Sequence, residues 1–183
     1  MTITRLATAV AVAGLTFAGA AQADGIRFFP ALEKGFKLEP TLAVTGGMTH
    51  AAGTRDDNMG SYGIDFNMNC GLFQTPANRI RTHVQINRVD ESGIKATSFE
   101  LSPRYTLPLG AGFSIGAGPA LAMVSVDNGN ADRNLFGYGA VAGLNFRAGM
   151  FYAGTDIRYL NTNERDRVQF ENWTWLAKVG VNF

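Results

Sequence analysis

Several residue types on which protein chemistry often depends are scarce in this chain of 183 residues. The single cysteine, Cys70, has no partner for an intramolecular disulfide. A small hydrophobe on a strand is the favoured interpretation of Cys70, and a reactive thiol is the alternative. One cysteine and two histidines without ligand spacing give little support to a metal site. The net charge is only +1, so the sequence also lacks the basic excess that nucleic-acid binding needs.

Long hydrophobic runs are missing as well. Hydrophobic residues make up 46% of the chain and the mean hydropathy is −0.01, which excludes a polytopic helical membrane protein. The apolar stretch Leu6–Ala18 follows Arg5 and precedes an A-x-A cleavage site, Ala21-Gln22-Ala23. Residues 1–23 are therefore predicted to be a secretory signal peptide. No cysteine follows the cleavage site, so a lipoprotein is not expected.

The chain has instead 22 glycines, 13 phenylalanines and a two-residue alternation of apolar and polar side chains. Successive side chains of a strand lie on opposite faces, so alternation predicts strands with one apolar face. Eight strands are predicted, over residues 38–50, 61–71, 79–90, 95–107, 113–126, 135–147, 150–160 and 171–183. At about 11 residues each, they are long enough to cross a bilayer when tilted. An even number of strands places both termini in the periplasm.

The segment before the first predicted strand, residues 24–37, does not alternate. Pro30 interrupts it, and the segment is predicted to be a periplasmic N-terminal lead-in to the barrel. The alternative is a small amphipathic plug or clamp at the barrel mouth, built from Phe28, Phe29 and Phe36.

The last strand carries the most specific pattern. In ENWTWLAKVGVNF, the residues Trp173, Trp175, Ala177, Val179, Val181 and Phe183 take alternate positions, and the chain ends on an aromatic residue. This strand resembles the terminal strand of bacterial outer-membrane β-barrels, and the whole chain resembles small barrels of the OmpA transmembrane-domain and OmpX type. The resemblance implies an all-β, eight-stranded, antiparallel up-and-down transmembrane barrel over residues 38–183. It also implies that the barrel assembly machinery reads Trp175, Val179, Val181 and Phe183.

The second face of the predicted strands is polar and charged. It carries Asp65, Arg81, His83, Glu100, Arg104, Asp156, Arg158 and Lys178. The solvated surface of a soluble barrel would also carry such charges. The signal peptide, the terminal Phe183 and the aromatics near strand ends favour a membrane barrel with this face inward. The interior of an eight-stranded barrel is just wide enough for side chains, so these residues are predicted to form a lumen charge network that closes the pore.

The sequence gives weak support to a catalytic site or a calcium site. His83 with Ser98 or Ser102 and Glu100 is a conceivable nucleophile arrangement, but the H-x-S signature of barrel lipid A deacylases is missing. His83 is therefore assigned to the polar lumen, and neither catalytic residues, a metal nor a cofactor is predicted. Two acidic clusters faintly resemble calcium loops and are better explained as turns: Asp56, Asp57 and Asn58, and Asp127, Asn128, Asn130 and Asp132.

Pro103 and Pro119 lie on consecutive predicted strands, at similar distances from the turn between them. Proline donates no hydrogen bond to a sheet and is avoided inside paired strands. Each proline could sit at a β-bulge. The functional alternative is that missing hydrogen bonds leave a lateral opening to lipid.

The predicted function is a non-enzymatic outer-membrane protein that supports the envelope or presents surface loops. Its expected partners are outer-membrane lipid and the assembly machinery, and it is expected to be a monomer. The first alternative is binding or lateral passage of a small hydrophobic molecule. A lipid-modifying barrel enzyme is the second alternative.

Overall fold

The computed structural model describes residues 25–51, 59–91, 94–127, 132–163 and 171–183. The predicted signal peptide, the cluster Asp56–Asn58, and Asn128 and Asn130 lie outside these residues. Among the described residues, no helix is long and apolar enough to cross a membrane.

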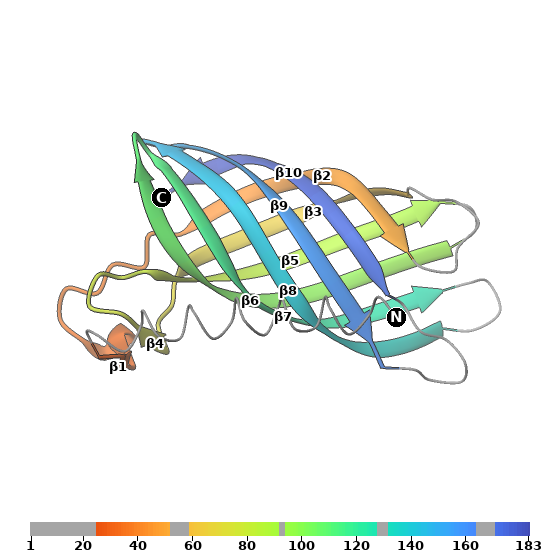
Figure 1. The fold of residues 1–183 in the computed structure, drawn as a ribbon, viewed down its shortest axis with the longest axis horizontal. Coiled ribbons are helices and arrows are strands. Elements are labelled where there is room, and N and C mark those ends of the chain that lie inside the picture. Colours follow the sequence, from red (N-terminus) through yellow and green to blue (C-terminus); the bar gives the residue numbers. More distant parts are fainter. Residues whose placement is uncertain (1–24, 52–58, 92–93, 128–131, 164–170) are drawn as a thin grey trace, which may run out of the picture.

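Eight long strands close into one antiparallel barrel (Figure 1). Each strand pairs with its neighbour in the chain, and the last strand pairs with the first, which confirms the predicted up-and-down barrel. The strands are β2 (Thr41–Ala51), β3 (Met59–Asn69), β5 (Ile80–Glu91), β6 (Ile94–Gly110), β7 (Phe113–Asp127), β8 (Asp132–Ala148), β9 (Phe151–Thr162) and β10 (Asn172–Asn182).

Most strand ends differ from the sequence prediction by one to three residues. The first barrel strand begins at Thr41 and not at Leu38, because Glu39 has a φ of 46° and breaks the extended conformation. Pro40 thus lies before the strand, where its carbonyl accepts a hydrogen bond from the Phe183 amide at 2.9 Å. The turn predicted for residues 108–112 is shorter, because β6 continues to Gly110.

Cys70 is a buried small side chain, as predicted, but it does not lie on a strand. β3 ends at Asn69, and the Cys70 amide donates to the Ile80 carbonyl at 2.9 Å. This turn buries the thiol, which is 2% exposed. Cys70 therefore packs at the end of the barrel and does not face the surroundings of the wall.

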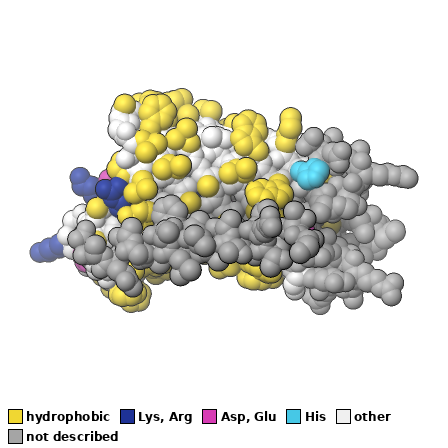
Figure 2. Space-filling model, viewed as in Figure 1, with side chains coloured by type: hydrophobic (Ala, Val, Ile, Leu, Met, Phe, Trp, Pro, Cys, Tyr) yellow, Lys and Arg dark blue, Asp and Glu magenta, His cyan; other side chains and the backbone are white. Residues whose placement is uncertain are grey.

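The outer surface of the barrel carries a continuous apolar belt, visible over the wall in Figure 2. Aromatic pairs mark its two edges. At the end that carries the C-terminus, the rings of Phe113 and Phe146 lie 4.7 Å apart, and at the other end those of Tyr159 and Trp173 lie 5.0 Å apart. Along β7, the belt runs from Phe113 to Met123. Ten residues of tilted strand give a height of about 25 Å, the thickness of the apolar band of membrane barrels.

The predicted lead-in folds against the connection between β3 and β5. β1 (Arg27–Phe28) pairs antiparallel with β4 (Phe73–Gln74), and a short 3-10 helix, η1 (Pro30–Leu32), follows β1. We call residues 26–32 together with residues 71–75 the rim clip. It lies at the end of the barrel that carries the C-terminus (Figure 1).

Candidate functional site

The lumen is the candidate site, because the strand register brings the predicted inward charges to a common level. Asp65 of β3 lies opposite Gln85 of β5, which in turn lies opposite Glu100 of β6. Across the lumen, Asp156 of β9 lies opposite Leu176 of β10, two residues before Lys178. All of these side chains are buried.

Lys178 is the centre of the arrangement. Its Nζ donates to Asp65 Oδ2 at 3.1 Å and to Asp156 Oδ2 at 2.9 Å, and so joins opposite walls of the barrel. Arg104 Nη1 donates to the same Asp156 oxygen at 2.8 Å. Two carboxylates and two cations thus neutralise each other away from water. Buried charges persist only when they are paired in this way.

Two further side chains complete this central cluster. Gln85 Nε2 donates to Asp65 Oδ2 at 2.8 Å and to Asp156 Oδ2 at 3.1 Å. His83 Nδ1 lies 3.0 Å from Asp65 Oδ2. We define the central cluster as Asp65, His83, Gln85, Arg104, Asp156 and Lys178. Gln85 was not among the predicted site residues, although its place on the inward face of β5 was visible in the alternation.

The other predicted charges lie outside the central cluster. Arg158 Nη1 donates to Glu100 Oε2 at 2.7 Å and forms a separate buried pair. Arg81 donates mainly to amide oxygens, with Nη1 bound to Asn69 Oδ1 at 2.9 Å and Nη2 to Asn67 Oδ1 at 3.0 Å, and its Nη1 also lies 3.9 Å from Glu39 Oε2. The eight predicted residues therefore divide into the central cluster, the Glu100–Arg158 ion pair and Arg81, which is held by amides and by a longer contact with a partly exposed carboxylate.

An aromatic side chain fills the lumen beside the cluster. Tyr152 is fully buried, with Lys178 Nζ 5.9 Å and the Arg147 guanidinium carbon 5.3 Å from its ring centre. Its hydroxyl donates to Asn145 Oδ1 at 2.6 Å. Cations over an aromatic face are attracted by its quadrupole, so Tyr152 closes this part of the lumen with favourable contacts.

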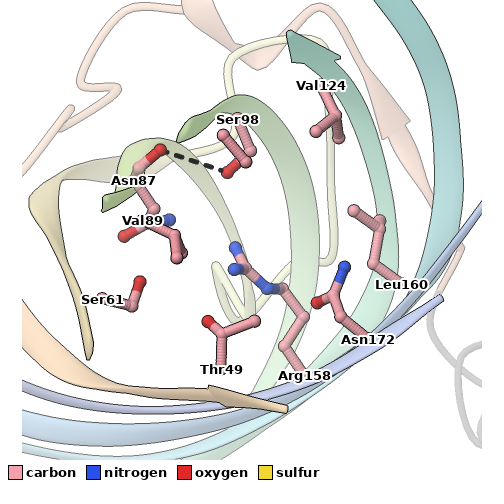
Figure 3. Close-up of a pocket in the computed structure, with 10 residues that line it drawn as sticks. Thr49, Ser61, Asn87, Val89, Ser98, Val124, Arg158, Leu160 and Asn172 are labelled. Atoms are coloured by element: carbon pink, nitrogen blue, oxygen red, sulfur yellow. Dashed lines mark hydrogen bonds between the residues drawn. The ribbon is translucent and has the colours of Figure 1, made fainter. Parts of the chain in front are cut away.

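At the other end of the lumen, an apolar cluster packs beside buried polar side chains such as Thr49 and Asn172, and the sequence prediction of a charge-filled interior missed it. Eight buried side chains form this apolar cluster: Met59, Val89, Ala96, Ala122, Val124, Val126, Leu135 and Leu160. Between it and the charges lies a cavity of about 20 Å³, lined among others by Asn87, Ser98 and Arg158 (Figure 3). That volume has room for about one water molecule.

The conceivable nucleophile arrangement of His83, a serine and Glu100 is not present, because Glu100 does not lie beside His83. Glu100 pairs with Arg158, and the carboxylate beside His83 is that of Asp65. Ser102 lies opposite His83 in the register, but its Oγ accepts hydrogen bonds from Arg104 Nε and Nη2, both at 3.3 Å. Ser102 is 0% and His83 2% exposed, so a substrate cannot reach them in this conformation.

A metal centre is also without support in the structure. Among the residues that the structure describes, no group of three His, Cys, Asp or Glu side chains could hold a metal ion.

The two prolines face each other across β6 and β7. Paired residues of these strands run to Leu101 with Leu121 and resume at Tyr105 with Ala117, a register that places Pro103 opposite Pro119. On their other sides, Pro103 pairs with Thr82 and Pro119 with Ala140. The ladder is thus interrupted at one point of the wall. Behind it, Ser102, Arg104 and Ala120 are buried and fill the interior.

The predicted assembly residues lie on the outward face of β10 and, for Phe183, directly after its end. Trp175, Val179, Val181 and Phe183 are all exposed, and Phe183 is 72% exposed. Asn182 holds this end of the barrel: its Nδ2 donates to the Gly149 and Phe151 carbonyls at 3.0 and 2.9 Å. Thr41 Oγ1 donates to Asn182 Oδ1 at 2.8 Å across the closing seam.

Comparison with known proteins gives structural neighbours only. No protein-family model and no curated protein matches the sequence. The chain is similar in structure to neisserial surface protein A, with a TM-score of 0.54, 16% identity, and coverage of 80% of this chain and 97% of that one. It is also similar to Ail, the attachment invasion locus protein of Yersinia pestis, with a TM-score of 0.51, 14% identity, and coverage of 81% and 100%.

The fold is that of the small eight-stranded outer-membrane β-barrels. The predicted resemblance is therefore confirmed at the level of the fold. At 16% and 14% identity, the neighbours do not transfer a residue role to this chain. Its particular chemistry has to be inferred from its own lumen, wall and rims.

Proposed function

We propose that the protein is a non-enzymatic barrel of the bacterial outer membrane that supports the envelope or presents surface segments to partners. The observation that carries this proposal is the filled lumen. The central cluster and the apolar cluster occupy it in two layers. A barrel filled in this way would serve as an anchor and a scaffold, because side chains of the described residues occupy the lumen and bury His83 and Ser102.

Features of three parts of the chain support this location. Residues 1–23 have the pattern of an export signal. The belt between the aromatic edges matches the apolar thickness of a bilayer, so outer-membrane lipid would surround the wall. The exposed apolar face of β10 would be read by the barrel assembly machinery. The continuous wall needs no second copy for closure, which supports a monomer.

Presentation of surface segments is supported by the length of the strands at the end opposite the C-terminus. β6 and β8 have 17 residues each, whereas about 9–11 suffice to cross a bilayer. Beyond the belt, the outward side chains of β5, β6, β7 and β8 become polar: Arg88, Asp90, Lys95, Thr97, Ser125 and Asn134 are exposed. The hairpins β5–β6 and β7–β8 therefore extend into water.

The test compares cells that produce the protein with cells that lack it. We expect identical mass spectra of lipid A and phospholipids, because the residues around His83 are closed to substrate. A mass shift of one acyl chain would overturn the non-enzymatic assignment.

A variant with residues 52–58 and 164–170 replaced by Gly/Ser segments of equal length then separates the two non-enzymatic roles, envelope support and presentation of surface segments. If cells with this variant no longer bind the surface partners that cells with the wild-type protein bind, the replaced segments present the binding surface. If these cells resist detergent as well as wild-type cells do, the barrel alone supports the envelope.

Lateral passage of a small hydrophobic molecule is the second candidate, and the interrupted ladder at Pro103 and Pro119 supports it. Missing hydrogen bonds lower the cost of separating β6 from β7. In the same cells, replacing both prolines by valine would reduce uptake of an apolar fluorescent probe if this wall opens. Unchanged uptake would sink the candidate.

A further inference from the structure

The rim clip exposes large apolar side chains although it is well ordered by hydrogen bonds. Phe28, Phe29, Leu32 and Leu72 are 72%, 59%, 86% and 63% exposed. They gather on a short two-stranded sheet and the helical turn beside it. A group of this kind on a protein surface commonly marks an interaction site.

Hydrogen bonds hold the clip to the barrel in one arrangement. The Phe29 amide donates to the Leu72 carbonyl at 2.7 Å. Gln74, which is 0% exposed, joins β4 to the start of β5: its Nε2 donates to the Ile80 carbonyl, and its Oε1 accepts from the Ile80 amide, both at 2.7 Å. Arg27 Nη2 donates to Asn78 Oδ1 at 2.8 Å. The apolar side chains are therefore presented by a built unit.

The backbone at Phe29 contributes to this presentation. Neighbouring residues of a regular strand lie on opposite faces, yet Phe28 and Phe29 are both exposed. Phe29 has a φ of 55°, in the left-handed region that bulky residues rarely adopt. This bend ends β1 and keeps both rings away from the rest of the protein. Such strain is typical of functional positions.

The depth of the clip indicates what covers it. At the end of the barrel that carries the C-terminus, the apolar belt ends at Phe183, whose amide donates to the Pro40 carbonyl. The rim clip lies beyond this edge of the belt, a few residues along the chain from Pro40, which directly precedes β2. The Asn69 amide donates to the Leu38 carbonyl at 2.8 Å, and β3 leads directly from there into Leu72. A few residues beyond the belt correspond to the headgroup layer of a bilayer, which is roughly 5–8 Å thick on each side.

The charge around the clip fits the same surface. Residues 25–40 and 71–80 contain the basic residues Arg27, Lys34, Lys37 and Arg79 and the acidic residues Glu33 and Glu39. Lys34 and Lys37 are exposed, and Lys and Arg gather at this end of the molecule in Figure 2. Apolar side chains next to basic ones are the combination that binds an anionic lipid interface.

We propose that the rim clip is an interfacial anchor that inserts Phe28, Phe29, Leu32 and Leu72 into the periplasmic phospholipid leaflet of the membrane that holds the barrel. Arg27 is paired with Glu33 at 2.7 Å, so the exposed Lys34 and Lys37 are the cations that bind lipid phosphates. This inference rests on the proposed membrane location and adds a second, peripheral attachment to the spanning one. The clip thereby fixes the depth and the tilt of the barrel at its periplasmic rim.

The test measures immersion depth by spin labelling of the full chain, refolded into vesicles of neutral phospholipid with about one third anionic phospholipid. Single cysteines replace Leu32, the belt residue Val44 or the polar-rim residue Lys95, each in a Cys70→Ala background whose folding is checked by heat-modifiable migration. Relative accessibility to oxygen and to a water-soluble nickel chelate reports depth. We expect the label at position 32 to be at least about twofold less accessible to nickel than the label at 95, and less deeply immersed than that at 44.

The outcomes separate the inference from the proposed function. If the label at 44 is immersed and the label at 32 is as accessible to nickel as that at 95, the clip does not bind lipid and the inference is wrong. If the label at 44 is itself exposed to water, the membrane location fails. Dipolar broadening between labels at 32 would show that a second copy covers the clip, which also overturns the inference. Replacing Lys34 and Lys37 by glutamine should move the label at 32 toward water in anionic vesicles only.

Discussion

Lys178→Met is expected to lower the free energy of unfolding of the barrel by about 3–5 kcal/mol. Methionine has nearly the length of lysine and fills the same space, but it leaves Asp65 and Asp156 without the cation that joins them. Both carboxylates are at most 1% exposed, so water cannot replace the ammonium group. Urea titration of the refolded protein, followed by tryptophan fluorescence, measures the difference.

Two matched variants make the Lys178 result specific. Lys95→Met removes a cation from an exposed, outward position and should change stability by less than about 0.5 kcal/mol. Asp65→Asn combined with Lys178→Met removes one charge of each sign and should recover part of the loss, because the remaining Asp156 still has Arg104. A loss below about 1 kcal/mol for Lys178→Met would mean that the cluster does not hold the walls together.

Gly143→Ala is expected to destabilise the barrel by about 1–3 kcal/mol through overpacking. Gly143 of β8 lies opposite Asp156 of β9, and a Cβ at Gly143 would overlap Asp156 Oδ1 and contact the Thr155 carbonyl oxygen at 2.8 Å. The carboxylate would have to move away from Arg104 and Lys178, which hold it. The urea midpoint of the variant provides the measurement.

The control for Gly143→Ala is Gly46→Ala. Gly46 lies in β2, and a Cβ at this position meets no atom within 4 Å. Its replacement should leave stability unchanged within about 0.5 kcal/mol. Equal effects of the two substitutions would show that the loss does not come from overlap of the new Cβ with Asp156, and that Gly143 makes no special room for the cluster.

The fold could be predicted from alternation because a membrane barrel exposes one face of each strand to lipid and the other to a polar lumen. The period of two therefore runs through the whole chain, and inward residues such as Asp65 and Lys178 were identifiable one by one. Closure by β10 and β2 was predictable as well, since unpaired backbone groups cannot remain in lipid.

The pairing inside the lumen was not predictable in the same way. Which carboxylate meets Lys178 depends on the register of four strands, and a shift of two residues would keep every face while changing every partner. For the same reason, the sequence did not reveal that Glu100 pairs with Arg158 and that Asp65 lies beside His83. Alternation identifies the residues that face the lumen, but it does not show which of them lie at the same height along the barrel axis. The apolar cluster around Val124 and Leu135 was therefore not predicted.

The alternative of an amphipathic clamp at the barrel mouth already named Phe28 and Phe29, but the strand pairing that builds the rim clip was not predicted, for a different reason. β1 and β4 have two residues each, too few for a period to be recognised. Their pairing depends on the positive φ of Phe29 and on Gln74, whose amide makes hydrogen bonds that a strand would otherwise make. Short elements of this kind are specified by contacts between distant segments, which a single sequence does not display.

The closed lumen is the central claim, and the conductance of the purified, refolded protein in planar lipid bilayers tests it most directly. With the central cluster, Tyr152 and the apolar cluster in place, we predict that the current stays at the baseline of the bare membrane across the usual range of voltages. Large, stable single-channel steps in the wild-type protein would contradict the account, because they require a continuous water-filled path through the side chains that fill the barrel.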